Sequence, residues 1–123
     1  MKFDAMLYSL CRRRKLKDEV AARMGMKGLS WPSVRLLIRL MEVGGKGLLA
    51  VVGSRGEFVA ARRECLKLGY VREREVANDG TLGSTHPMVT EIGLTKAGRA
   101  LAEPGFLYLQ RLAERVGKVA SEQ

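Results

Sequence analysis

Apolar residues recur at helical spacing in several stretches of the chain, and at strand spacing in two others. The segment WPSVRLLIRLMEVG has apolar residues every three or four positions, which predicts a core helix with Ser30 as N-cap and Pro32 in its first turn. Its inward stripe consists of Val34, Leu36, Leu37, Ile38, Leu40 and Met41.

A second and a third helix are predicted next. Residues 48–52 form a compact apolar patch that Gly53 interrupts, and Ser54 is placed to cap the following helix, over 54–68. In that helix a buried face is predicted from spacings of three, four and three, at Phe58, Ala61, Cys65 and Leu68. The opposite side carries Arg55, Glu57, Ala60, Arg63 and Lys67. A helix that is packed on one side and basic on the other fits the major groove of DNA.

The stretches 70–76 and 88–94 alternate from residue to residue and predict a β-hairpin. The glycine-rich segment ANDGTLGSTHP between them predicts a mobile tip. This tip contains no arginine, so we expect contacts from Arg72, Arg74 and His86 to reach phosphates rather than base edges. His86 by itself is more often a surface residue than a ligand or a pH switch.

From Trp31 to about Glu103, roughly three-fifths of the chain, this order of elements resembles a winged-helix DNA-binding domain. It is most similar to the MarR-type transcriptional regulators, on the strength of the core helix, the helix ending in LKLGYV and the exit LTKAGRAL, in which Leu94, Thr95 and Gly98 match best. The wing departs from that family, because His86 and Met88 stand where an Asp-x-Arg segment is usual. The turn between the two helices is also about one residue short.

A competing helix-turn-helix is readable in DEVAARMGMKGLSWPSVRLLIRL, with SVRLLIRL as its recognition helix. Its turn is about three residues longer than the motif allows, and no hairpin follows it. The later placement is therefore preferred.

The N-terminal stretch is apolar at Phe3, Met6, Leu7 and Leu10 and then strongly basic. A helix either continues to Met24 or breaks near Lys17 and restarts with Asp18 as its cap. The first 29 residues have a net charge of +5, from eight basic and three acidic residues. The basic run either contacts DNA phosphates or forms a solvated helix face. Its members are Arg12, Arg13, Arg14, Lys15 and Lys17.

The C-terminal stretch has a coiled-coil stripe at Leu109, Leu112, Val116 and Val119. A helix this short must bury its stripe, either against a second copy or back onto its own chain. We favour packing against a second copy of the chain, because the winged domain already has its own core. Such a pairing, with the apolar N-terminal residues Phe3, Met6, Leu7 and Leu10, would resemble MarR-type dimers.

Composition narrows the classes of function. With 123 residues, a formal charge of +9 and a pI near 10.1, the chain is one domain that favours a polyanionic partner. It has one histidine and two cysteines without metal-ligand spacing, so no metal site, cofactor or enzyme is expected, and the cysteines are interpreted as buried free thiols. The absence of an apolar run or secretory signal predicts a cytoplasmic protein without membrane contact. The scarcity of Asn and Gln beside many charged residues suggests a thermophilic source.

The sequence thus predicts a mainly α fold with a small β-hairpin wing (α+β), a winged helix-turn-helix flanked by N- and C-terminal dimerisation helices. Its expected parts are a basic helical arm (1–29), the winged domain (30–103) and a dimerisation helix (104–123). The chain is expected to be a transcriptional regulator that binds double-stranded DNA as a homodimer. The resemblance also implies a small effector, for which no residue is specified. The alternative is a protein-interaction module in a transcription or replication assembly, which two acidic residues on the presumed DNA helix, Glu57 and Glu64, favour.

The expected DNA contacts lie on the third helix, the wing and the arm. On the helix, the residues expected to face bases and nearby phosphates are Ser54, Arg55, Glu57, Ala60 and Arg62. Those expected to contact the DNA backbone are Arg63 and Lys67. Glu57 either accepts from a cytosine amino group or orients Arg55.

Overall fold

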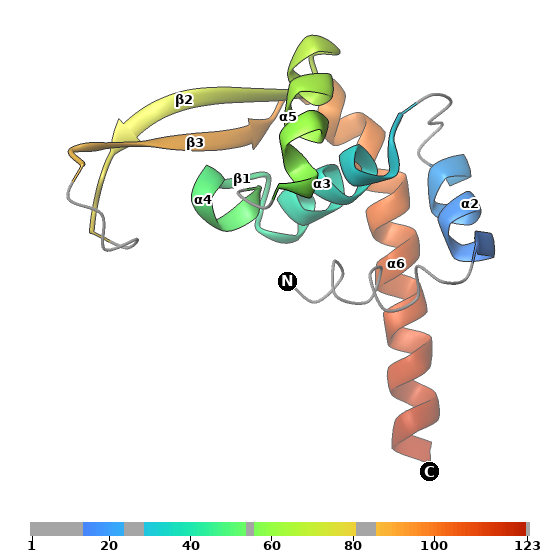
Figure 1. The fold of residues 1–123 in the computed structure, drawn as a ribbon. Helices are drawn as coiled ribbons and strands as arrows, with labels where there is room; N and C mark the ends of the chain where they lie inside the picture. Colours follow the sequence, from blue (N-terminus) through green and yellow to red (C-terminus); the bar gives the residue numbers. More distant parts are fainter. Residues whose placement is uncertain (1–13, 24–28, 54–55, 81–85, 123) are drawn as a thin grey trace.

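The chain forms a helix pair followed by a β-hairpin, with further helices before and after (Figure 1). The computed structural model describes residues 14–23, 29–53, 56–80 and 86–122, with side chains except those of residues 14–17, 57 and 116–122. The described helices are α2 (Arg14–Arg23), α3 (Trp31–Glu42), α4 (Leu49–Val52), α5 (Glu57–Lys67) and α6 (Lys96–Glu122). The described strands are β1 (Lys46–Leu48), β2 (Val71–Ala77) and β3 (Met88–Leu94). This order is a winged helix-turn-helix, mainly α with a small antiparallel sheet, as predicted.

Helix α3 lies at the centre of the core. The side chain of Ser30 accepts a hydrogen bond from the Ser33 N–H, and Pro32 occupies the first turn, so the predicted N-cap is confirmed. All residues from 33 to 40 are buried, and the four largest aliphatic side chains among them have no exposed surface. A helix enclosed in this way has no face for DNA, which excludes the competing placement of the helix-turn-helix.

Helix α5 packs on α3 through Phe58, Ala61 and Cys65, all buried as predicted. Leu68 was wrongly assigned to that face, because the helix ends at Lys67 and Leu68 at the C-cap is 49% exposed. The helix also begins about one turn later than predicted, at Glu57 after Gly56, and the predicted cap Ser54 lies outside the described residues.

The thiol of Cys65 is free and buried, as predicted. Burial raises its pKa to about 11, so it remains protonated and unreactive at neutral pH. Cys11 lies outside the described residues.

The sheet has one more strand than the predicted hairpin. Strands β2 and β3 pair antiparallel from Val71–Leu94 to Ala77–Met88, within one residue of the prediction. The short strand β1 pairs with the other edge of β3, which gives the order β1-β3-β2. Two glycines at positive φ, Gly44 (90°) and Gly45 (101°), turn the chain from α3 into β1. The GGKG segment, residues 44–47, thus contains the turn that connects α3 to the sheet.

The exit from the wing begins α6. The Thr95 hydroxyl accepts from the Gly98 N–H (3.1 Å) and donates to the Gly69 carbonyl (2.6 Å), which caps the helix and ties it to the end of α5. A Cβ at Gly98 would overlap the carbonyl oxygen of Tyr70, so the helix approaches β2 this closely only with glycine there. The matches to the winged-helix exit sequence therefore have direct structural reasons.

Helix α6 continues through Pro104 to Glu122. Residue 104, where a C-terminal dimerisation helix was predicted to begin, instead lies inside α6. Pro104 removes a single N–H from the ladder, which the packed helix tolerates. Leu109 is fully buried in the core of the same chain, so for this residue the stripe packs back onto the monomer.

Helix α2 lies beside α6 (Figure 1) and runs unbroken past Lys17, so the alternative restart at Asp18 is not adopted. The Tyr108 hydroxyl donates to the Glu19 carboxylate, which raises the pKa of Tyr108. The Arg23 guanidinium lies 3.8 Å from the centroid of the Tyr108 ring. In the described part of the chain, no helix combines the length and apolarity needed to cross a bilayer.

Candidate nucleic-acid interface

The outer face of α5 is the clearest candidate for contact with a polyanion. Its exposed residues are Val59, Ala60, Leu66 and, as the only described charged side chains, Arg63 and Lys67. At 100° per residue these positions fall within one third of the helix circumference, centred on Arg63. We define this set as the α5 outer face. No ion-pair partner of Arg63 or Lys67 occurs among the described residues.

Val59 was not among the predicted contacts, although it is 46% exposed beside the predicted contacts Ala60 and Arg63. A helical projection from the buried residue Phe58 would have found it, because Val59 lies 40° from Arg63 on that projection. Exposed apolar side chains on a groove-binding helix can contact the methyl group of thymine.

Glu64 anchors α5 to the N-terminus of α3. One carboxylate oxygen accepts from the Ser30 N–H (3.0 Å) and the Ser30 hydroxyl (3.2 Å). Hydrogen bonds from Ser33 and Ser30 lower the pKa of Glu64 below its usual value, and the position at a helix N-terminus favours its negative charge. Glu64 therefore stabilises the fold by joining α5 to α3. Its carboxylate is engaged within the chain, so it does not favour the protein-interaction alternative.

Arg62 joins α5 to the wing. Its guanidinium forms two hydrogen bonds with the Glu73 carboxylate on β2, one of them from Nη2 at 3.0 Å, and the pKa of Arg62 is raised mainly by this pairing. The predicted role of Arg62 at the bases is thus joined by a structural role, since the side chain is already engaged within the chain.

Arg39 holds the short helix α4 in place. It is 7% exposed, and its Nε and Nη2 donate to the last carbonyls of α4, at Val52 (2.7 Å) and Val51 (3.3 Å). Its guanidinium also lies 5.1 Å from the centroid of the Phe58 ring. One buried cation thus connects α3, α4 and α5, the three helices that present the α5 outer face.

The wing carries Arg72 and Arg74 on exposed positions of β2. Arg74 pairs with Glu91 of β3 at 2.8 Å, whereas Arg72 has no ion-pair partner among the described residues. His86 is exposed, and its carbonyl accepts from the Asn78 side chain (2.7 Å) where the strands separate. The tip itself, residues 81–85, lies outside the described residues.

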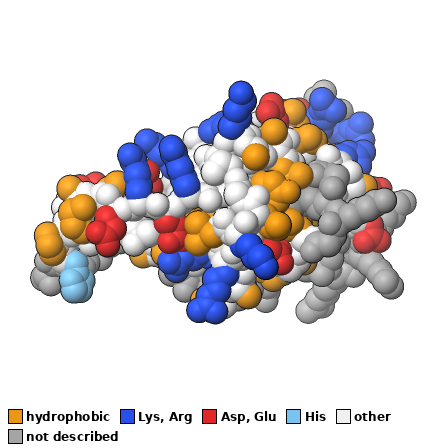
Figure 2. Space-filling view, turned by 90° about the horizontal axis from the view of Figure 1, so that it is seen from above, with side chains coloured by type: hydrophobic (Ala, Val, Ile, Leu, Met, Phe, Trp, Pro, Cys, Tyr) orange, Lys and Arg blue, Asp and Glu red, His pale blue; other side chains and the backbone are white. Residues whose placement is uncertain are grey.

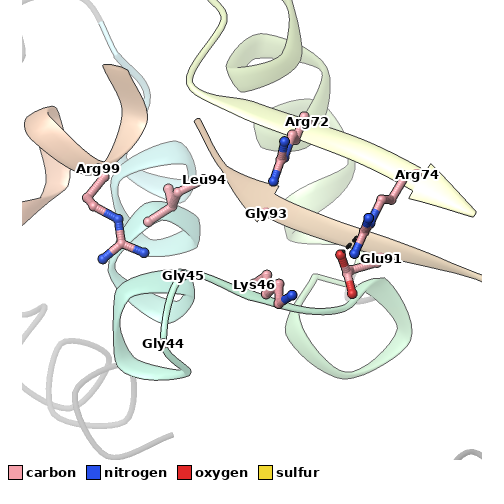
Figure 3. A pocket seen from close by; sticks show the side chains of 9 residues that line it. All are labelled: Gly44, Gly45, Lys46, Arg72, Arg74, Glu91, Gly93, Leu94 and Arg99. Atoms are coloured by element: carbon pink, nitrogen blue, oxygen red, sulfur yellow. Dashed lines mark hydrogen bonds and ion pairs between the residues drawn. The ribbon is translucent and has the colours of Figure 1, made fainter. Parts of the chain in front are cut away.

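Two further basic residues lie near the wing arginines and were missed by the sequence analysis. Lys46 of β1 and Arg99 of α6 line a hollow on the sheet together with Arg72 and Arg74 (Figure 3). No signal at the level of sequence spacing joins residues 46, 72 and 99, because the pairing of β1 with β3 brings them together.

The remaining predicted residues are only partly placed. Outside the described residues lie Ser54, Arg55, Arg12, Arg13, Phe3, Met6, Leu7 and Leu10. Only the backbone is described for Glu57, Arg14, Lys15, Lys17, Val116 and Val119. Leu112 is half-buried against the core of its own chain. Figure 2 shows Lys and Arg side chains projecting at several places from the hairpin and the body of the molecule.

Comparison with known proteins matches the chain to no protein-family model and to no curated protein. Among solved structures it is similar to the crystal structure of an organohalide-sensing transcriptional regulator in the ligand-free form. The TM-score is 0.47 and the sequence identity 16%, over 98% of this chain and 68% of that one.

Proposed function

We propose that this chain is a homodimeric transcriptional regulator that places α5 in the major groove of double-stranded DNA. The α5 outer face carries the proposal. Its two cations, Arg63 and Lys67, have no partner among the described residues, and its apolar members are small enough to approach base edges.

The fixed back of α5 supports a role in recognition. Buried Phe58 and Cys65, the Glu64 bonds to Ser30 and the Arg62 pair with Glu73 hold three sides of the helix. Among the described side chains of α5, those of the outer face remain for a partner. A rigid helix loses little conformational freedom on binding, so its contacts translate efficiently into affinity.

Within this arrangement, the N-terminal part of α5 and the preceding turn face the bases, with Ser54, Arg55, Glu57, Val59 and Ala60. Arg63 and Lys67 hold the phosphates. Arg62 positions the wing. The wing contacts phosphates through Arg72, Arg74 and His86, and the basic arm through Arg12, Arg13, Arg14, Lys15 and Lys17.

A homodimer would present two copies of α5 to successive turns of the duplex, as two-fold symmetric regulators of this fold class do. Its proposed interface uses Leu112, Val116 and Val119 of α6, with Phe3, Met6, Leu7 and Leu10. Leu109 is left out, because it is already buried in the monomer.

The test is duplex binding by the Arg63→Gln/Lys67→Gln variant over a salt series, followed by fluorescence anisotropy. Each phosphate contact contributes about 0.9 to the slope of log affinity against log salt, so the variant should lose about 2 units of slope. The Arg111→Gln/Arg115→Gln variant removes the same charge from exposed positions of α6 and should keep the slope of the wild type.

Equal slopes for the two variants would overturn the assignment of α5. If the wild type failed to bind duplex DNA even at low salt, the protein-interaction module would replace the regulator as the better explanation of the fold.

A further inference from the structure

A row of three residues crosses the outer surface of the sheet with its middle side chain missing. Lys46 of β1 and Arg72 of β2 both pair with Gly93 of β3, one from each side. Residues opposite each other in antiparallel strands point to the same face, so the two cations flank a gap in which a side chain would otherwise stand. A Cβ at Gly93 would lie 3.3 Å from the Lys46 Cβ and 4.0 Å from the Arg72 Nε, inside that gap.

The gap widens into a cavity of about 190 Å³, here called the sheet hollow. Figure 3 shows Arg72 and Arg74 extending from β2 on one side, Lys46 on the other, and Arg99 of α6 at the end near Gly45. A Cβ at Gly45 would overlap the Arg99 guanidinium, so glycine there lets that side chain lie against the backbone. The volume exceeds the ~150 Å³ of a protein cavity known to hold benzene, so a small polyatomic ion fits.

The sheet hollow has an excess of positive charge. It is lined by four cations and one carboxylate, Glu91, which is already paired with Arg74 at 2.8 Å. Lys46, Arg72 and Arg99 have no ion-pair partner within the described residues. Three like charges around one hollow repel one another, and a bound dianion would relieve that repulsion.

The hollow is separate from the α5 outer face. Glu73, which alternates with Arg72 and Arg74 along β2, pairs with Arg62 of α5, and its neighbour Val71 is buried. The arginines of the hollow therefore lie on the face of the sheet that points away from α5.

We propose that the sheet hollow binds a phosphate group, held between Lys46 and Arg72 across Gly93, with Arg99 at the end near Gly45. Guanidinium groups donate two parallel hydrogen bonds to phosphate oxygens, and Lys supplies a compact charge. The phosphate comes either from a DNA backbone or from a free phosphorylated small molecule. Only the first source rests on the DNA-binding function proposed above.

The experiment compares Arg99→Gln and Lys46→Gln with the wild type and with Arg115→Gln, an equal loss of charge at an exposed position of α6. Sodium phosphate is titrated against sodium chloride at matched ionic strength, and the amide signals of Gly45 and Gly93 are followed by NMR. Saturable phosphate-specific shifts are expected in the wild type and in Arg115→Gln, with affinity at least about tenfold weaker in the two hollow variants. Duplex binding over a salt series is measured on the same four proteins.

The two sources give different results. A slope about 0.9 lower for Arg99→Gln than for Arg115→Gln identifies the phosphate as one of the DNA backbone. Phosphate binding that the hollow variants lose without any change of slope identifies a free phosphorylated ligand. The proposal is overturned if neither the slope nor the phosphate titration distinguishes the hollow variants from Arg115→Gln. A wild type that binds no duplex would refute the DNA-binding function, and the phosphate titration would still decide the site.

Discussion

Single side chains of this chain often connect elements that are distant in sequence. Glu64 joins α5 to the start of α3, and Gly98 admits the backbone of Tyr70 where a methyl group would collide with it. Glu64 is the more informative of the two, because its contribution depends on its charge. A carboxylate at a helix N-terminus stabilises the helix through both hydrogen bonds and the helix dipole.

Glu64→Gln should lower the free energy of unfolding by about 0.3–1 kcal/mol at neutral pH. The folded-state pKa of Glu64 lies below its usual value of 4.5, so the stabilisation is present above that value and is lost as pH falls through the folded-state pKa. The difference between wild type and variant should therefore shrink in acid. Urea unfolding at neutral pH and well below pH 4.5 measures it, with Glu103→Gln, at an exposed position of α6, as the control. A difference that stays constant with pH would contradict the role of the charge.

At the level of elements, α4 is too short to be stable by itself. It has four residues, and its last carbonyls depend on donors from elsewhere. Arg39 supplies these donors from α3, from a position where a cation is buried and must be well paired. The geometry of the helix-turn-helix thus depends on a residue that belongs to neither of its two helices.

Arg39→Met should destabilise the protein by about 2–3 kcal/mol, because the buried carbonyl of Val52 and the partly buried carbonyl of Val51 lose hydrogen bonds from a charged donor. The stability of Arg39→Lys should lie between that of the wild type and that of Arg39→Met, since a lysine keeps the charge but not the planar set of donors of the guanidinium group. Urea unfolding measures both variants, with Arg111→Met, at an exposed position, as the control. A loss for Arg39→Met no larger than that of the control would show that α4 is held by packing alone.

At the level of the whole molecule, α6 has two different parts. Its first half belongs to the core, with Ala102 and Leu109 fully buried. Its later turns extend past α2 and α3 in Figure 1, and the predicted stripe continues there to Val116 and Val119. A stripe that continues beyond the other described helices is what a pairing between two copies requires.

Val119→Glu should convert the proposed dimer into a monomer, because it places a charge on the apolar seam. Sedimentation of wild type and variant at several concentrations measures the change. Ser121→Glu adds the same charge off the stripe and should leave the dimer intact. A wild type that sediments as a monomer, or equal behaviour of the two variants, would contradict this interface.

The sequence by itself determined the elements whose pattern is local. Helical spacing placed α3 and the buried face of α5, and alternation placed β2 and β3 within one residue of their observed bounds. The cap at Ser30 was also readable, because a cap uses residues within one turn. These features depend on neighbours three or four positions away, and a single sequence contains that information. The exit at Thr95 and Gly98 was expected only from the resemblance to winged-helix domains.

Only the tertiary structure decided what depends on distant neighbours. Strand β1 has three residues and no pattern of its own, and it exists because β3 has an open edge beside it. That pairing brings Lys46, Arg72 and Arg99 together, and the same packing assigns Glu64 to α3 and Leu109 to the core. Helix α6 runs through Pro104 because its packing against α2 and α3 outweighs one missing hydrogen bond. Local periodicity specifies which face of an element is apolar, whereas the partner of each side chain follows only once the elements are packed.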